Sequence, residues 1–459
     1  MTQNRQELYN SRCSTRQFLF SKTDHAPQDK KKLSVGMDKL LKEFPNILIG
    51  KSFTESARTK IYPFKEFAAM AVQADLSSDS DADTGSDTDA DIKTEYLLLD
   101  VAKTIDSVCN LYYASKGIGG LIEPLVFGCL FPEKDDAFCL EIAAKINESL
   151  SKIRNDTVTI GIASYPCAHF DKDQIIENAL KALDHASFFG LGGTTCFDAV
   201  SLNISGDRYY QKGDIYGAIE EFNSALMLEP SNVNVRNSLG VCYGVLRFYQ
   251  KALKQFEAAL RIDSNELMAL YNTGLVNMLT DNKDKAIEYF LRAGSMGEEV
   301  FEAAFQIGRL YLKKKEFKNG KKYLEKALKL RPDSGLTCRY IGECYAGLNM
   351  PNEAIAAYKK AIKQNPYDAA SLSAIGYLFD IQGENPEIST VFCKHSVELV
   401  PDNGLYRNRL GRLYLKQNRL DDALKEFIRA SQLGYDSKQY IEKTEDLKVE
   451  TETWKLEAG

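Results

Sequence analysis

Residues 240–259 read GVCYGVLRFYQKALKQFEAA, and the same spacing of small and aromatic residues recurs along the C-terminal half of the chain. In this copy the glycine is followed by Tyr243 after three residues, Ala252 after twelve, Phe256 after sixteen and Ala259 after nineteen. The glycine itself recurs with a spacing of 34 residues five times and 35 residues once, at Gly206, Gly240, Gly274, Gly308, Gly342, Gly376 and Gly411. A fixed period of this length indicates a repeat array.

Two antiparallel helices per repeat explain this pattern. Small residues on both helices let the two backbones approach closely, and the aromatic residues fill the space toward the next repeat. Pro230, Pro332 and Pro366 end the second helix, because proline cannot continue the hydrogen-bond ladder. One such unit cannot bury its apolar face alone, so the copies must stack. Two copies depart from the pattern: the third has Asn277 at the aromatic position, and the sixth has a one-residue insertion and Pro386.

The repeat pattern resembles the tetratricopeptide repeat family. The resemblance predicts an all-α solenoid of seven copies over residues 199–435, followed by a capping helix over residues 436–459. It also implies that a protein or peptide partner lies in a groove lined by the first helix of each repeat. Arginine and tyrosine are residue types that dominate binding energy at interfaces, although each candidate could equally be a solvated surface residue. The groove candidates are Asn237, Tyr271, Arg309, Arg339, Tyr377 and Arg412.

A groove that clamps a terminal carboxylate is a subtype that the sequence tests directly. Such a clamp needs cations and asparagines at matching positions of successive repeats. The first two repeats present Asn203, Asp207, Asn237 and Val241 at these positions. We therefore expect no carboxylate clamp in the first three repeats.

The N-terminal half alternates between short apolar runs and amphipathic segments. Such alternation indicates an α/β domain with helices packed on a sheet, which we place at residues 65–198. Residues 1–64 are predicted to be a partly helical extension that also holds a short apolar strand. Within the domain, strands are predicted over residues 66–75, 124–132, 156–166 and 194–200, and helices over residues 94–113, 136–153 and 172–190.

An acidic insert interrupts this domain. Residues 79–91 read DSDADTGSDTDAD and hold six aspartates without a cation. A polar run of like charges repels itself and buries no core, so a disordered loop is predicted over residues 76–92. Calcium binding is the alternative. An EF-hand loop that begins at Asp79 would need glycine and glutamate where Thr84 and Ala90 stand, so that alternative fails.

The order of the predicted elements resembles the second half of the GGDEF domain, the bacterial diguanylate cyclase family. The resemblance rests on the strand VFGCLFPE at residues 126–133, the strand VTIGIASYP at residues 158–166, and the helix DQIIENALKALDHASFFG at residues 173–190. It covers residues 65–200 and implies a GGDEF-like α/β fold.

The catalytic signature of that family is missing. In one alignment the GGDEF position is occupied by Glu123, Pro124, Leu125, Val126 and Phe127. If Gly119 and Gly120 form the glycine pair instead, Leu121 takes the third position. In either register a leucine stands where the family carries a metal-binding acid, and leucine cannot hold the Mg²⁺ that phosphoryl transfer needs.

The other functional positions of the family have also changed. The resemblance maps the strand-one aspartate pair onto Gln73 and Asp75, the phosphate-contacting lysine and arginine onto Ser187 and Leu191, and the product-inhibition site onto Ala114 and Gly117. Of these six mapped positions, only Asp75 keeps the acid that the family carries there. We therefore predict a degenerate GGDEF-like domain with no catalytic residues, no metal and no cofactor, in a protein that is not an enzyme.

Composition narrows the partner classes. The chain has 459 residues and a net charge of −6, which gives no reason to expect nucleic acid. No apolar stretch reaches the roughly 20 residues that span a bilayer, and the polar N-terminus lacks a signal peptide. Ten cysteines without a CxxC motif and four dispersed histidines favour reduced, buried thiols over a metal site. A cytoplasmic protein without membrane insertion is expected.

These patterns together predict a non-catalytic scaffold or adaptor in a bacterial cytoplasm. The repeat groove would hold a protein partner, and the GGDEF-like domain would serve as a docking surface, a homodimerisation unit or an N-terminal cap. A nucleotide sensor that binds GTP or cyclic di-GMP without turnover is the alternative, and a residual diguanylate cyclase is a third hypothesis.

Overall fold

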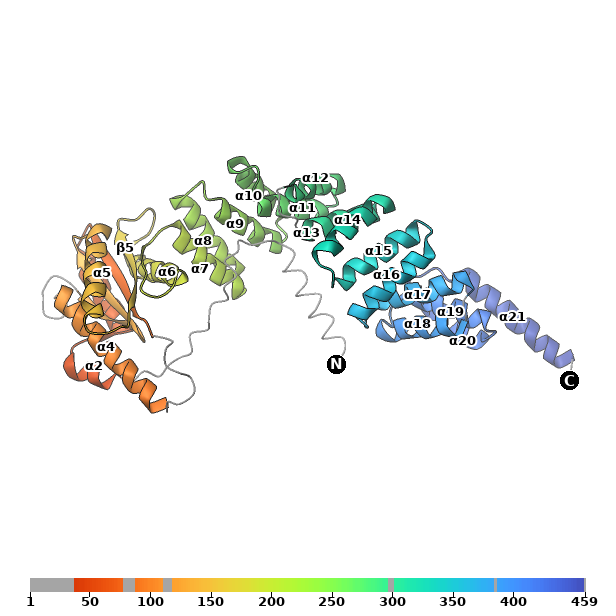
Figure 1. Ribbon diagram of the computed structural model, residues 1–459, viewed down its shortest axis with the longest axis horizontal. Helices are drawn as coiled ribbons and strands as arrows, with labels where there is room; N and C mark the ends of the chain where they lie inside the picture. Colours follow the sequence, from red (N-terminus) through yellow and green to blue (C-terminus); the bar gives the residue numbers. More distant parts are fainter. Residues whose placement is uncertain (1–36, 77–86, 110–117, 296–300, 384–385, 458–459) are drawn as a thin grey trace. The chain divides into compact units, whose positions relative to one another are not determined.

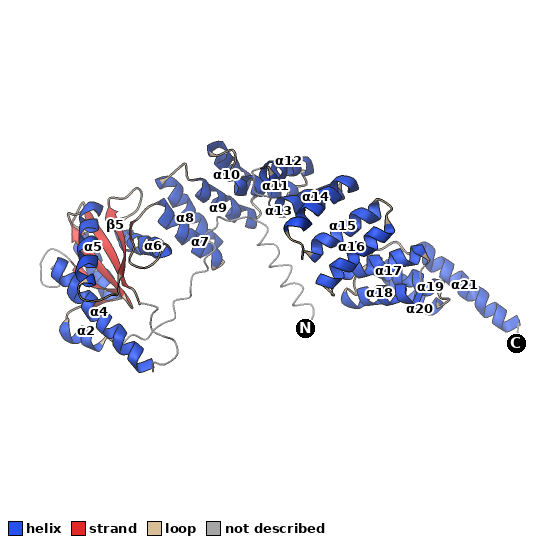
Figure 2. Ribbon diagram, viewed as in Figure 1, coloured by secondary structure: helices blue, strands red, loops and turns tan. Residues whose placement is uncertain are grey.

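A computed structural model describes residues 37–76, 87–109, 118–295, 301–383 and 386–457. Strands lie only in the N-terminal part of the described chain, and every element after them is a helix (Figure 2). The chain forms two compact units, residues 1–269 and residues 270–459. In the described residues, no helix has both the length and the apolar character needed to cross a membrane.

A six-stranded sheet is the centre of the N-terminal part, with the strand order β1-β3-β4-β2-β5-β6. The strand β2 runs antiparallel to its neighbours β4 and β5, and β3 runs antiparallel to β4. The strand β1 runs parallel to β3, and β6 runs parallel to β5. The elements are α2 (Asp38–Glu43), β1 (Leu48–Ile49), α3 (Lys51–Ile61), β2 (Phe67–Ala74), α4 (Asp87–Cys109), β3 (Ile118–Glu123), β4 (Val126–Pro132), α5 (Asp136–Ser151), β5 (Val158–Tyr165), the 3₁₀ turn η1 (Lys172–Gln174), α6 (Ile175–Phe188) and β6 (Thr194–Cys196).

Helices cover both faces of this sheet. Successive side chains of a strand point to opposite faces, and β2 is apolar on both. Met70 and Val72 belong to the core beneath α2, α4 and α5. Ala69 and Ala71 belong to the core beneath α3 and α6. The near-continuous apolar run of β2 is therefore a central strand that is buried on both sides.

Residues 38–61 belong to the sheet domain, which corrects their prediction as an N-terminal extension. The strand β1 extends the sheet, since Leu48 pairs with Gly120 of β3. The helix α3 packs on the sheet through Phe53, which is fully buried. The ring of Phe53 lies where a Cβ on Gly120 or on Gly128 would stand, 2.5 Å from its nearest atom in each case. These two glycines pair across β3 and β4 and make room for an aromatic ring, so Gly120 is a strand residue and not part of a turn.

The acidic segment is shorter than the predicted 76–92 loop. The helix α4 begins at Asp87, so the last part of the aspartate run is helical. Residues 77–86 lie outside the described residues.

The helix α6 is shared between the sheet and the first repeat (Figure 1). It lies directly on β5, where a Cβ on Gly161 would stand 2.1 Å from the backbone nitrogen of Leu183. Its other side packs against α7, the first repeat helix. Lys181 of α6 forms an ion pair with Glu221 at 2.7 Å, and Asp184 pairs with Arg208.

A buried hydrogen-bond cluster completes this junction. His185 Nδ1 lies 3.2 Å from Asp198 Oδ1 and 3.2 Å from the Ser201 hydroxyl. Asp198 also caps α7 by accepting from the backbone N–H of Ser201 at 2.8 Å. Burial alone would raise the pKa of Asp198, but the hydrogen bonds from His185 and Ser201 outweigh burial and hold this pKa below its usual value.

Gly161→Ala is expected to lower the free energy of unfolding by at least about 2 kcal/mol, because the new Cβ overlaps backbone atoms of α6. The midpoint of urea denaturation, followed by circular dichroism, measures the change. Gly294→Ala is the control, since an added Cβ there meets nothing within 4 Å; its effect should stay within about 0.5 kcal/mol. Equal shifts for the two variants would contradict this packing.

Seven helix pairs follow the sheet, as the repeat pattern predicts for the described residues. Each repeat glycine faces the large residue sixteen positions later; a Cβ on Gly240, for example, would stand 2.5 Å from the ring of Phe256. The sixth repeat has one extra residue, so Gly376 faces Cys393 instead. The pairs are α7 (Ala199–Gln211) with α8 (Ile215–Leu228), α9 (Val233–Val245) with α10 (Tyr249–Ile262), α11 (Leu267–Leu279) with α12 (Lys283–Gly294), α13 (Phe301–Lys313) with α14 (Phe317–Leu330), α15 (Gly335–Gly347) with α16 (Pro351–Gln364), α17 (Ala369–Gln382) with α18 (Pro386–Leu399), and α19 (Gly404–Lys416) with α20 (Leu420–Gln432).

A final helix, α21 (Lys438–Glu457), packs against α20, where a capping helix was predicted. Between the two helices of every repeat, the residue seven positions after the glycine has a positive φ. The first and sixth repeats use Gly213 and Gly383 there, whereas the second and fourth use Arg247 and Lys315. The left-handed turn is thus a shared feature of all seven repeats; five of them have Gly, Asn or Asp at this position, the residue types that adopt this conformation most readily.

Candidate functional site

Residues 123–127, which the sequence resemblance places at the GGDEF position, lie on the hairpin between β3 and β4. Pro124 and Leu125 form its turn, with Leu125 at φ 69°. Glu123 ends β3, whereas Val126 and Phe127 begin β4. Of the two alignments, the one that starts at Glu123 therefore falls on a turn. The hairpin offers one carboxylate, that of Glu123, and an apolar tip.

Asp75, the one acid among the positions that the sequence resemblance maps, forms hydrogen bonds inside the protein. Its side chain accepts hydrogen bonds from the Thr157 hydroxyl at 2.8 Å, the Thr159 hydroxyl at 2.9 Å and the Gly192 backbone N–H at 2.9 Å. Asp75 is 2 % exposed, and burial raises its pKa although the three hydrogen bonds oppose the rise. This carboxylate holds the strand ends together.

The remaining family positions give no phosphate site either. The Ser187 hydroxyl donates to the carbonyl of Leu183 within α6, and Leu191 is an exposed apolar residue. Ala114 and Gly117 lie outside the described residues. Among the residues that the structure places, no three histidine, cysteine, aspartate or glutamate side chains converge as metal ligands.

Two of the predicted groove residues are buried, which corrects their prediction as exposed contact residues. Asn237 on α9 is 1 % exposed. Tyr271 on α11 is 2 % exposed, and its ring packs against Phe290 at 5.3 Å. Burial raises the pKa of Tyr271 to about 12. Both residues therefore lie in the interior between helices. A polar residue on the first helix of a repeat can thus be covered instead of facing a groove.

Arg309 and Arg339 meet at a tyrosine that the sequence pattern did not single out. The guanidinium of Arg309 on α13 lies 5.4 Å from the ring centre of Tyr340, and that of Arg339 on α15 lies 4.9 Å from the same centre. Arg309 also donates to Gln306 at 3.0 Å. Each guanidinium is therefore within the distance at which a cation is attracted to an aromatic ring.

Tyr377 and Arg412 form a second arrangement of the same kind. Tyr377 on α17 has Arg409 at 4.6 Å and Arg412 at 5.4 Å from its ring centre, both from α19. Arg409 also donates to the Ser373 hydroxyl at 3.0 Å. We call Arg309, Arg339, Tyr340, Tyr377, Arg409 and Arg412 the first-helix strip, since all of them lie on first helices of repeats four to seven.

The carboxylates near the strip are already paired. Asp368 accepts from Arg339 at 3.1 Å, and Asp380 accepts from Lys416 at 2.6 Å and lies 3.9 Å from Arg412. Glu343 lies 3.8 Å from Arg339; burial raises its pKa, and Arg339 only partly offsets the rise.

Two arginines of the strip have no such partner. Within the described ranges, no ion pair joins Arg309 or Arg409 to a carboxylate. Burial lowers the pKa of Arg409, because the surroundings of its guanidinium supply less solvation than water does. A partly buried cation without a counter-ion costs stability.

Tyr340 and Arg409 are functional candidates that the sequence reasoning missed. Both stand two positions before the repeat glycine, at Gly342 and Gly411. The predicted residues were taken from positions three before and one after the glycine. Comparing the position two before it across repeats would have found a tyrosine and an arginine.

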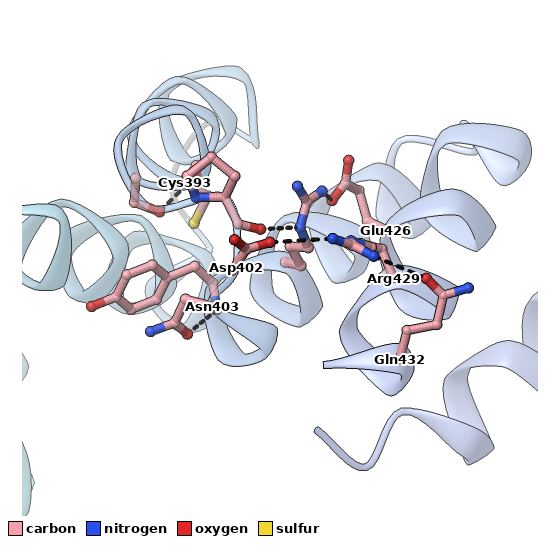
Figure 3. Close-up of polar contacts among 10 residues, drawn as sticks. Cys393, Asp402, Asn403, Glu426, Arg429 and Gln432 are labelled. Carbon is pink, nitrogen blue, oxygen red and sulfur yellow. Dashed lines mark hydrogen bonds and ion pairs between the residues drawn. The ribbon is translucent and has the colours of Figure 1, made fainter. Parts of the chain in front are cut away.

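Arg407 shows the contrasting, fully satisfied environment on the same helix α19. It donates to the carbonyl of Pro401 at 2.6 Å and to Glu426 at 2.7 Å. Figure 3 shows Glu426 beside a second contact of this kind, in which Arg429 reaches Asp402 and Gln432. Arg236 in the second repeat makes the same contacts, to Pro230 at 2.6 Å and to Gln255 at 3.3 Å. Arg407 and Arg236 each join the loop before their helix to the second helix of the same repeat.

Arg409→Met and Arg407→Met should change stability in opposite ways. Arg409→Met is expected to leave the free energy of unfolding unchanged within about 0.5 kcal/mol or to raise it, since it removes an unpaired, partly buried charge. Arg407→Met is expected to lower it by about 2 kcal/mol, because Glu426 loses its partner. Urea denaturation of both variants measures the difference. Comparable destabilisation by the two substitutions would show that Arg409 is structural.

Comparison with known proteins identifies the class of the helical part. Models described as TPR repeat and Tetratricopeptide repeat match residues 206–244, 243–295, 301–334 and 341–368. These matches confirm the tetratricopeptide repeats, which here form a helical solenoid. The matched ranges lie within the predicted array.

Several curated relatives share this part of the chain. It is 33 % identical over 95 residues to BBSome complex member BBS4 of Mus musculus, covering 21 % of this chain and 18 % of the relative. It is 26 % identical over 212 residues to the anaphase-promoting complex subunit CDC16 of Saccharomyces cerevisiae, with 44 % and 24 % covered. It is 21 % identical over 244 residues to the mitochondrial import receptor subunit TOM70 of S. cerevisiae, covering 51 % of this chain and 39 % of the relative. The chain thus spans about a fifth to two fifths of these relatives.

Two solved structures are similar to part of the chain. The structure of YrrB, described as a TPR protein with an unusual peptide-binding site, is 21 % identical and covers 41 % of this chain and 96 % of its own, with a TM-score of 0.38. The structure of MamA is 27 % identical and covers 36 % and 96 %, with a TM-score of 0.34.

Proposed function

We propose that this protein is a non-catalytic scaffold that holds a protein or peptide partner on the first-helix strip. Tetratricopeptide repeats serve protein–protein interaction, and the relatives described above are named as a complex member, a complex subunit and a receptor subunit. The single observation that carries the proposal is the pair of arginines, Arg309 and Arg409, that lie against tyrosine rings and form no ion pair within the described residues; the charge of Arg309 acts on Glu343, whose pKa burial nevertheless raises.

The chemistry of the strip suits a polypeptide. Arginine and tyrosine are enriched among the residues that dominate binding energy. A guanidinium that already lies against an aromatic ring loses less freedom when it binds, and it can donate two parallel hydrogen bonds to a carboxylate. Tyr406 and Tyr358 lie close enough to both Arg339 and Arg409 for these charges to lower the tyrosine pKa values, although burial raises both pKa values overall.

The α/β domain is proposed to act as the N-terminal cap of the array. The terminal repeats of a solenoid need a covered outer face, and α6 supplies that cover for α7. The elements β2, α4, β3, β4, α5 and β5 follow the order β-α-β-β-α-β, which is the split arrangement of a ferredoxin-like sheet. This arrangement supports descent from a GGDEF-like domain without its chemistry. A docking or dimerising role for the domain has no comparable contact in the described residues to support it.

A reducing compartment such as the cytoplasm is the proposed location. Six of the nine described cysteines are buried as free thiols, and burial raises the pKa of Cys242 and of Cys393 to about 12. Such thiols are unreactive packing residues.

The partner should be lost when the unpaired arginines of the strip are removed. Full-length protein is used to capture partners from a lysate of its source, beside an Arg309→Ala/Arg409→Ala variant. An Arg261→Ala/Lys363→Ala variant removes two exposed cations elsewhere and serves as the charge-matched control. Quantitative mass spectrometry should show proteins retained at least about tenfold better by the wild type and the control than by the variant. An identical set of captured proteins would remove the strip from this proposal.

The nucleotide-sensor alternative predicts a different result. Because the Asp75 carboxylate is held by Thr157, Thr159 and Gly192, and Leu125 stands at the metal-binding position, we expect no binding of GTP or cyclic di-GMP. Calorimetric titration with each nucleotide and Mg²⁺ should give no heat beyond dilution at about 100 μM ligand. Saturable heat with either nucleotide would restore the sensor, and formation of cyclic di-GMP from GTP would restore the cyclase.

A further inference from the structure

A dense group of cations lies outside the first-helix strip, on the fourth repeat. Residues 313–331 hold nine Lys or Arg residues and two acids, a net charge of +7 in a chain whose total is −6. Lys318, Lys322, Lys326 and Lys329 are spaced by four, four and three residues, so they lie along one side of α14. We call these four residues and Lys315 the lysine ridge. Lys315, Lys318, Lys322 and Lys329 are exposed.

The two acids within this stretch do not neutralise the ridge. Glu316 accepts from Asn319 at 3.0 Å and lies 3.1 Å from Lys314. Glu325 accepts from the Tyr345 hydroxyl at 3.3 Å. Both carboxylates therefore already have partners that are not ridge residues.

The acids of the neighbouring helix pairs are also engaged elsewhere. Asp284, before α13 in the chain, lies 2.9 Å from Lys314, and Glu302 on α13 lies 2.9 Å from Arg331. In the part of the chain that the structure places, no ion pair joins Lys315, Lys318, Lys322 or Lys329 to a carboxylate. Four exposed lysines in a row thus repel one another and attract an anionic partner.

We propose that the lysine ridge docks an acidic, extended polypeptide segment of a partner protein. A shallow hollow lies beside the ridge, lined by Lys322, Tyr323, Glu325, Lys326, Leu328, Lys329 and Pro332; Glu325, its one acid, accepts from the Tyr345 hydroxyl. This mixture of cations and apolar groups fits acidic residues interleaved with apolar ones. From Lys318 to Lys329 the helix rises about 16 Å, which matches about five residues of extended chain. The surface is on a second helix, so it binds independently of the first-helix strip.

Nucleic acid and membrane surfaces fit the ridge less well. Single-stranded nucleic acid needs aromatic rings that are open to base stacking, but Tyr323 is stacked on Tyr311 at 5.8 Å. A helix that lies on a membrane needs bulky apolar side chains to insert, and none of the exposed large hydrophobic residues of the described chain lies on α14.

The test compares two charge-reversed full-length proteins. Lys318→Glu/Lys322→Glu/Lys329→Glu reverses the ridge, and Lys394→Glu/Lys425→Glu/Lys443→Glu makes the same charge change at exposed lysines of later helices. The probe is a fluorescent peptide with the sequence of residues 79–91, and its binding is followed by anisotropy. A peptide with asparagine at the six aspartates, a duplex DNA and phosphatidylserine vesicles are the comparison probes. A second set of measurements uses the same proteins with those six aspartates of the chain changed to asparagine, which removes the chain's own acidic segment as a competitor.

The proposal expects the acidic peptide to bind the wild type and the control with equal affinity, and the ridge variant at least about tenfold more weakly. Raising the salt from about 50 to about 300 mM should weaken the binding several-fold. Arg409→Ala should leave it unchanged, which separates this surface from the strip of the proposed function. Circular dichroism checks that both variants are folded. Equal binding by the ridge and control variants, equal binding of the asparagine peptide, tighter binding of DNA or vesicles than of the peptide, or no binding in either set would each overturn the proposal.

Discussion

The close contact of α6 with β5 at Gly161 is the constraint on which the N-terminal unit depends. Because a Cβ at this position would stand 2.1 Å from the Leu183 nitrogen, the helix backbone lies directly on the strand. The opposite side of α6 is then available to α7, which it meets through Asp184 and His185. One helix therefore serves two layers, and the sheet and the first repeat share a core that includes Phe170 and Phe197.

The same device recurs within each repeat. A glycine on the first helix makes room for a large residue of the second, as Gly206 does for Phe222 and Gly411 for Phe427. Such pairs fix the spacing of helices whose first turns and faces are otherwise free to vary. This freedom is what allows repeats four to seven to carry arginines and tyrosines on first helices, and the fourth to carry lysines on its second helix, within one architecture.

The sequence predicted the elements whose residues repeat or alternate. The glycine period located the repeats, and the apolar runs located β2, β4 and β5. The contacts that depend on distant partners were not predictable: the need for glycine at positions 120 and 128 is explained only by Phe53, which packs against both, and residues 38–61 look like an extension until β1 pairs with β3. In the candidate site the residue types were predicted better than their exposure. Asn237 and Tyr271 stand at positions equivalent to Arg339 yet are buried, and the spacing of residues in the sequence does not distinguish the buried positions from the exposed ones. Tyr340 and Arg409 were missed because candidates were taken three positions before or one position after the repeat glycine, whereas these two residues stand two positions before it.

The central claim is that a partner polypeptide contacts the first-helix strip. Site-specific photocrosslinking tests it most directly, with a photoreactive phenylalanine analogue at Tyr377 in the strip and, separately, at Val391, an exposed residue on the second helix of the same repeat. The account predicts discrete crosslinked partner bands from position 377 and none of those bands from position 391. Crosslinks to the same proteins from both positions, or from position 391 alone, would contradict it.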